Sequence, residues 1–222
     1  MSAFPSPARS ATWIEKPDSL AIWQRTLGPE AGYTVTASHN LGTMLSLAGR
    51  YAEAEPLLRD ALATRRRLFG DAHESVGPSL RNLGVLLHRT GRLEEAERAL
   101  RDAAHNQRAA NAADHPRVLD VELSLGELLV DRAKAGEAEP LLRHVLEGRT
   151  ALFGPDHPAT AEAQRALAQC LTARQQFPEA ERLLVASERT LAPAPFKRIE
   201  LAKTRGALEA LYRAWGPGRK RR

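Results

Sequence analysis

The sequence predicts an all-α fold, an α-solenoid of tandem helix-turn-helix units, and two landmarks with one period predict it. The pattern L-G-x-x-L begins at Leu41, Leu83 and Leu125, and Leu167-Ala168 continues it, in steps of 42 residues. Glu-Ala-Glu recurs with the same step, at residues 53–55, 95–97, 137–139 and 179–181. A unit of this length that forms two amphipathic helices cannot bury its apolar faces alone, so the units are expected to stack on their neighbours.

Composition supports helices and a non-secreted chain. Aromatic residues make up 5% of the 222 residues, and the abundant Ala, Leu, Arg and Glu favour helices packed through small and aliphatic side chains. The single cysteine, Cys170, falls where other units have Met44, Leu86 and Leu128, which favours a buried core thiol over a reactive one. No run of about 20 apolar residues and no secretory signal is present, so we expect a cytoplasmic protein without membrane insertion.

The first full unit shows how each pair of helices is delimited. Apolar residues at three-to-four spacing predict a first helix that ends near Gly49 and a second that ends near Gly70. Gly70 and its equivalent Gly154 can adopt the left-handed conformation that closes a helix. Pro56 and Pro140 are expected in the first turns of second helices, where proline is tolerated.

Three histidines share one position in the connectors between units: His73, His115 and His157. Pro158 suits the first turn of the following helix, and Asp156 or His157 can cap it. The histidines also suggest a metal site. Successive units are about 10 Å apart, however, so three equivalent side chains cannot surround one ion, and capping or packing is the favoured interpretation.

Small residues recur where the two helices of a unit are expected to cross. The glycines of L-G-x-x-L, with Ala168 in the last unit, are expected to face the alanines of Glu-Ala-Glu, because larger side chains would push the helices apart. The positions are Gly42, Gly84, Gly126 and Ala168 on the first helices, and Ala54, Ala96, Ala138 and Ala180 on the second.

These motifs, with GRYAEAEPLL at 49–58 and LFGPDHPAT at 152–160, resemble tetratricopeptide repeats of the longer, kinesin-light-chain type. The resemblance implies a right-handed solenoid that serves as an interaction scaffold. It also implies the organisation of the chain: a disordered tail (1–16), a partial repeat of one helix (17–32), repeats at 33–75, 76–117, 118–159 and 160–196, a capping helix (197–215) and a basic tail (216–222).

The two ends of the chain suggest further roles. A helix containing Leu20, Ile22 and Trp23 lacks its first-helix partner, and this apolar edge is expected either to self-associate or to be covered by residues 1–16. The formal charge is +5, and four of those charges follow Gly218. This tail is interpreted as a solvated terminus; attraction to nucleic acid or to an anionic membrane, and a localisation signal, are its alternatives.

In the family that the chain resembles, the first helices line a concave groove, and the resemblance assigns groove positions to this sequence. Where related arrays often carry asparagines that hold a peptide backbone, this chain has His39, Arg81, Leu123 and Arg165, so that mode of binding is not expected. Asn40 and Asn82 lie one residue away and are interpreted as structural. The candidate peptide-binding residues are His39, Thr43, Arg81, Val85, His88, Leu123, Glu127, Arg165 and Gln169.

Charge along this groove suggests the kind of partner. Arg81 with His39 and His88 makes the first half positive, whereas Asp120 and Glu127 make the middle negative. An extended peptide with an acidic end fits this order; the alternative is a solvated surface without a ligand.

No nucleotide-binding, zinc-protease or serine-hydrolase motif is present, so we expect no catalytic residues, no metal, no cofactor and no small-molecule substrate. The recurring acidic residues are interpreted as solvated helix faces. The favoured function is a non-catalytic scaffold that binds a protein or peptide. One alternative is a structural module, part of a larger array or of an oligomer, whose exposed first and last helices pair with another copy or with a further domain. The least favoured alternative is a nucleic-acid adaptor that uses the basic tail.

Overall fold

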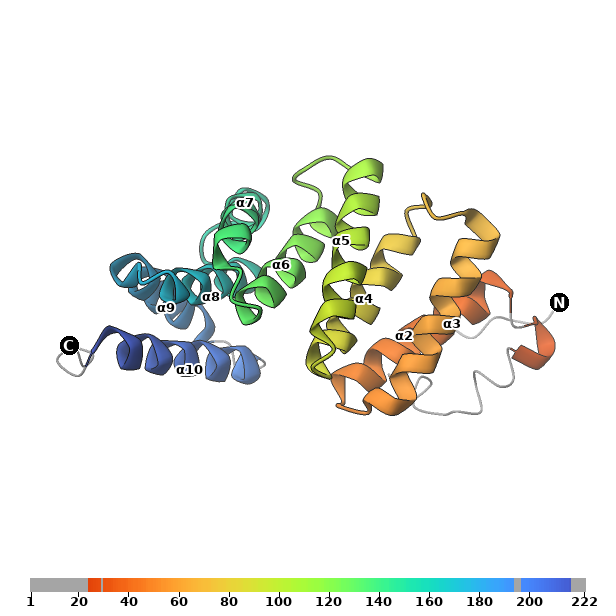
Figure 1. Ribbon diagram of the computed structural model, residues 1–222, viewed down its shortest axis with the longest axis horizontal. Helices are drawn as coiled ribbons and strands as arrows, with labels where there is room; N and C mark the ends of the chain where they lie inside the picture. The colour runs from red at the N-terminus through yellow and green to blue at the C-terminus, as the bar shows by residue number, and fades with distance from the viewer. Residues whose placement is uncertain (1–23, 29, 194–196, 217–222) are drawn as a thin grey trace.

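The structure, a computed structural model, describes residues 24–28, 30–193 and 197–216, and Figure 1 shows a row of paired helices. Residues 24–26 form a short helical stretch, and longer helices follow from Gly32 onward. Their bounds are α2 Gly32–Leu47, α3 Tyr51–Phe69, α4 Val76–Arg89, α5 Leu93–Ala110, α6 Pro116–Asp131, α7 Ala135–Phe153, α8 Pro158–Ala173, α9 Phe177–Leu191 and α10 Arg198–Trp215.

The helices pack as tandem pairs: α2 with α3, α4 with α5, α6 with α7, and α8 with α9. Helix α10 follows the last pair and packs on both α9 and α8. No strand occurs in the described residues. The predicted all-α solenoid of helix-turn-helix units is therefore confirmed.

The two helices of a unit form different layers. The backbones of first helices approach those of the next unit's first helices, as α4 does with α6 and α6 with α8, whereas the backbones of second helices in adjacent units are farther apart. In a curved stack the inner layer has the closer spacing. The first helices therefore lie on the inner side of the curve, as the resemblance implied.

Close crossing within each of the first three units depends on the missing side chain of one glycine. A β-carbon on Gly84 would lie 2.7 Å from Cγ of Leu100, and one on Gly126 would lie 2.6 Å from Cδ2 of Leu142. Gly42 meets Leu58 in the same way, at 3.0 Å. The predicted crossing is confirmed, with a leucine one turn beyond each small alanine as the residue that fills the space.

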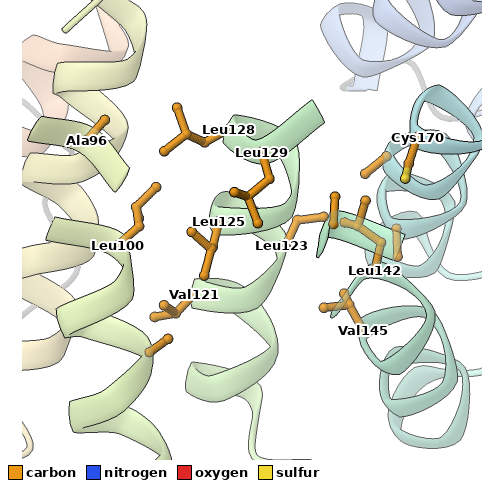
Figure 2. Packing of buried hydrophobic residues seen from close by; sticks show 14 of the residues in the cluster. Ala96, Leu100, Val121, Leu123, Leu125, Leu128, Leu129, Leu142, Val145 and Cys170 are labelled. Carbon is orange, nitrogen blue, oxygen red and sulfur yellow. The ribbon is translucent and has the colours of Figure 1, made fainter. Parts of the chain in front are cut away.

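The core runs continuously between the layers. Figure 2 shows Leu100 of α5 and Val121 of α6 pointing into one interface, and Leu123 pointing toward Leu142 of α7. Cys170 is fully buried in the same cluster, and its thiol donates to the carbonyl of Ala135 at 3.2 Å. Burial raises the pKa of this thiol to about 11, so the predicted core thiol is confirmed.

The connectors are fixed by histidine caps. Nδ1 of His157 accepts the backbone N–H of Ala159 at 3.1 Å, and His115 accepts that of Arg117 at 3.2 Å. The ring of Phe153 stacks on His157, with centroids 4.8 Å apart. The predicted capping role is confirmed for His115 and His157, whereas His73 precedes the N-cap of α4 and stacks on Phe69, with centroids 4.7 Å apart. The described residues contain no cluster of three or more His, Cys, Asp or Glu side chains that could hold a metal ion.

The second helices begin earlier than the sequence suggested. Pro56 is the sixth residue of α3, which begins at Tyr51, and Pro140 is likewise the sixth of α7. The prediction that both prolines lie in the first turn was wrong. Both side chains are exposed, so water can satisfy the carbonyl that each proline leaves without a helical donor.

The residues expected to form an apolar helix around Leu20 to Trp23, the tail 1–16 and the basic residues 219–222 lie outside the described residues. Gly28 is described, and its φ of +86° matches the +82° of Gly70. None of the described helices combines the length and the apolar character needed to cross a bilayer.

Candidate functional site

The candidate surface is the side of α2, α4, α6 and α8 that lies on the inner side of the curve, and we call it the first-helix face. Of the nine residues assigned to it, six keep at least partial exposure: Thr43, Arg81, Val85, His88, Glu127 and Gln169. The other three, His39, Leu123 and Arg165, are less than a tenth exposed.

These three share one repeat position with Arg81, and this position faces the first helix of a neighbouring unit, which buries three of its four side chains. His39 Nε2 lies 3.1 Å from Nδ2 of Asn82, which also donates to Thr43 at 2.9 Å. In the next unit Arg81 Nε donates to the carbonyl of Asp120 at 3.0 Å and to Ser124 at 3.1 Å. Residues at this position therefore join the units, and the predicted structural role of Asn82 agrees with its contacts.

Leu123 belongs to the hydrophobic core, where it points toward Leu142 (Figure 2). At this position α6 makes an apolar contact with its neighbours. The equivalent side chains in the two preceding units, His39 and Arg81, form hydrogen bonds instead. We therefore exclude Leu123 from direct contact with a ligand.

The first half of the face owes its positive charge to fewer groups than the sequence suggested. Burial, with the nearby Arg65 guanidinium, lowers the pKa of His39 to about 4, so this ring is neutral at neutral pH. His88 Nε2 contacts the Asp131 carboxylate at 2.7 Å. The expectation that three positive residues charge this half is therefore corrected: neither histidine supplies an unpaired charge at neutral pH.

The middle of the face is not a free negative patch either. Arg149, buried on α7, donates to Asp120 and to Glu162, both at 2.8 Å. Arg165 donates to Glu127 at 3.0 Å. Because arginines of the chain itself hold these carboxylates, the expectation that Asp120 and Glu127 make this region negative is corrected.

One charged residue of this region was not found from the sequence. Arg65 of α3 is 9% exposed, and its Nη1 donates to the hydroxyl of Ser79. Burial lowers the pKa of its guanidinium, and no carboxylate of the described residues pairs with it. A signal for it existed, because Arg65 and Arg149 are equivalent two units apart; assigning the face to first helices alone concealed it.

The opposite layer is held by an ion ladder formed by the Glu-Ala-Glu pattern. Arg101 contacts Glu97 of its own unit at 2.8 Å and Glu137 of the next at 2.7 Å. Arg143 repeats this arrangement one unit later, with Glu139 and Glu179, both at 2.9 Å. The interpretation of these acids as merely solvated was wrong, since they bind arginines across unit boundaries.

Comparison with known proteins gives one family. A family model described as Tetratricopeptide repeat matches residues 18–67, 33–109 and 117–190. A comparison with curated protein sequences gives no match.

Solved structures agree on the fold. BtubC (BKLC) from P. vanneervenii is 18% identical, with a TM-score of 0.73 over 93% of this chain and 85% of that one. A Podosopora anserina protein with nearly identical TPR-like repeats, assigned as a kinesin light chain, is 24% identical, with a TM-score of 0.65 over 79% and 83%. YrrB, described as a TPR protein with an unusual peptide-binding site, is 16% identical, with a TM-score of 0.52 over 88% and 92%.

The repeat period, the glycine crossings and the family model lead to the same assignment. The array resembles kinesin-light-chain-like arrays in fold, and the matched segments span well over half of the sequence. The chain therefore belongs to the tetratricopeptide repeat family.

Proposed function

We propose that this protein is an interaction scaffold that binds an extended acidic segment of a partner protein on the first-helix face, over α2 and α4. Tetratricopeptide repeats are interaction modules and are generally non-catalytic, which supports the scaffold role. The partly exposed Arg81 carries the finer proposal, because its hydrogen bonds go to a carbonyl, a hydroxyl and an amide.

A partly exposed arginine that is bound only to neutral groups, as Arg81 is among the described residues, favours an anionic partner. Arg81 remains charged at any physiological pH, and within the described residues no carboxylate pairs with it. Arg89, about two turns further along α4, donates to the carbonyl of Ser46, and it pairs with no carboxylate of the described residues. A partner carboxylate would therefore gain a charge-assisted hydrogen bond without displacing an ion pair of the protein.

The test compares two charge reversals in one protein. The partner is first captured from the native cell and identified by mass spectrometry, and its binding to the purified chain is then measured by fluorescence titration. Arg81→Glu is expected to weaken binding at least tenfold, whereas Arg98→Glu, on the exposed surface of α5, should change it less than twofold. Equal affinities for the two variants would remove the first-helix face from the proposal.

Exposed apolar side chains on α2 favour the second candidate, a self-associating structural module. Met44 is 38% exposed and Leu47 is 69% exposed, whereas Leu86, the equivalent of Met44 in the next unit, is fully buried. A second copy that covered this edge would remove apolar surface from water. Sedimentation of the intact chain and of Leu47→Glu decides it: monomers in both samples would contradict this candidate.

A further inference from the structure

Two arginines of the first half of the array, α2 to α5, recur two repeats later in the second half, α6 to α9. Their surroundings differ between the two halves. Arg65 is equivalent to Arg149, and Arg81 to Arg165, each pair being separated by 84 residues. In the second half Arg149 binds Asp120 and Glu162, and Arg165 binds Glu127. In the first half Arg65 donates to Ser79, and Arg81 donates to the carbonyl of Asp120 and to Ser124 of the following unit. The first half therefore has the same two cations at the same repeat positions, bound to neutral groups where the second half has carboxylates.

The missing anions can be identified residue by residue. The positions equivalent to Asp120, Glu162 and Glu127 are Thr36, Pro78 and Thr43. None of these three can carry a negative charge.

The residues next to these positions are more polar in the first half than in the second. Ser79 and Asn82 are polar where the second half has Ala163 and Ala166. The surroundings of the first-half arginines are thus more polar, yet lack the carboxylates that their second-half equivalents bind.

From this comparison we propose that two carboxylates of the bound partner occupy, beside Arg65 and Arg81, the places that Asp120 and Glu127 fill in the second half. This inference rests on the proposed function and adds Arg65, a second-helix residue, to the site. The second half also favours carboxylate as the ligand chemistry, because carboxylates already bind the equivalent arginines there.

A buried arginine at this repeat position can still be reached by a carboxylate that approaches from the solvent-exposed side of the first helix. The Arg149 side chain is 5% exposed, yet the Asp120 that binds it is 46% exposed, so that carboxylate reaches the guanidinium from the solvent side. Arg65 is buried to a similar extent, and Thr36, the equivalent of Asp120, is exposed. A partner side chain can therefore approach Arg65 over Thr36.

The spacing of the two places limits the partner sequence. Thr36 and Thr43 are seven residues apart on α2, which is about 10 Å along a helix at 1.5 Å per residue. An extended segment advances about 3.3 Å per residue. Two acidic residues separated by two others would match this spacing, if the segment lies along α2.

The decisive experiment supplies the missing acids from the chain itself. The double variant Thr36→Asp, Thr43→Glu copies the second-half arrangement onto the first, so it should pair both arginines and block the site while keeping the fold. The matched control, Ala52→Asp with Ala109→Glu, adds the same charge at exposed positions of α3 and α5. Circular dichroism melts check that both variants fold.

The probe is a fluorescein-labelled peptide, selected on the intact wild-type chain from a display library of random 12-residue peptides. We expect selected peptides to be enriched in acidic pairs three positions apart. The double variant should bind the best peptide at least tenfold more weakly than wild type, and the control within about twofold.

Three results would overturn the inference: selected peptides without acidic residues, equal binding by wild type and the double variant, or an equal loss in the control. Displacement by inorganic phosphate, but not by chloride at the same ionic strength, would assign the site to phosphate groups instead. If Arg81→Glu weakens peptide binding and the double variant does not, the inference fails and the proposed function stands. If neither change weakens binding, the proposed function fails as well.

Discussion

At the scale of single residues, the turn inside each unit uses one left-handed residue, and only two of the four units place glycine there. Gly49 and Gly91 have φ of +79° and +78°, and the equivalent Ala133 and Gln175 have +59° and +62°. A β-carbon disfavours this conformation by about 1 kcal/mol or more. The repeat geometry thus holds Ala133 and Gln175 in a conformation that their side chains oppose.

Ala133→Gly is therefore expected to stabilise the protein, by about 0.5–1 kcal/mol after the larger chain entropy of unfolded glycine is subtracted. Urea unfolding followed by circular dichroism measures it. Ala52→Gly, at a helical and exposed position, should destabilise by a similar amount. The same sign for both substitutions would contradict the strain at Ala133.

The pH dependence of stability should reflect the neutral ring of His39. Its folded pKa of about 4 lies below the unfolded value of about 6.5, so between these values the unfolded chain binds more protons. The contribution of the neutral ring to the free energy of unfolding is fully present above about pH 6.5. It falls by roughly 3 kcal/mol as the pH drops to 4. His39→Gln should flatten the measured loss of stability over this window, and an unchanged pH profile would contradict the assignment.

At the scale of helices, the sequence predicted what repeats and failed where equivalent positions diverge. The glycines at helix crossings and the capping histidines were predictable because close approach and a free backbone N–H impose the same residue type in each unit. Leu123 and Arg65 were not, because a repeat position shows which layer a side chain belongs to. It does not show whether the side chain points to solvent or into the joint with the next unit.

For the ion ladder, too, the repeating pattern was predictable and the contacts between units were not. The period of Arg101 and Arg143 equals that of Glu-Ala-Glu, so the partners were visible as a second pattern. Their pairing across unit boundaries depends on how far one unit is displaced from the next, which only the packed helices determine.

The crossing of α4 and α5 gives a direct test of helix packing. Gly84→Leu should destabilise the protein by about 3 kcal/mol, since even its β-carbon would meet Leu100 at 2.7 Å and the helices would have to separate. Thermal melts by circular dichroism measure the effect. Gly206→Ala in α10 is the control, because no atom lies within 4 Å of the added carbon, and it should be neutral or stabilising. An unchanged melt for Gly84→Leu would mean that the helices cross elsewhere.

At the scale of the whole molecule, the distribution of paired and unpaired charges distinguishes the two halves. The second-helix layer pairs its acids with arginines across units, and the second half of the first-helix face pairs Asp120, Glu127 and Glu162 internally. Among the residues that the structure describes, Arg65 and Arg81 of the first half pair with no carboxylate. Under the proposed function, an acidic ligand is therefore expected to bind the first half of the array, although the net charge of the chain is modest.

This asymmetry predicts how binding responds to salt. At 0.15 M salt, screening acts over about 8 Å, so paired charges elsewhere contribute little and the local contacts at Arg65 and Arg81 dominate. The Kd of the selected acidic peptide should rise about five- to tenfold between 0.05 and 0.5 M sodium chloride. In Thr36→Asp, Thr43→Glu the remaining weak binding should vary less than twofold over the same range, because the chain's own acids already pair with both arginines. A salt response equally steep in both proteins, measured by fluorescence titration, would place the attraction outside this half of the face.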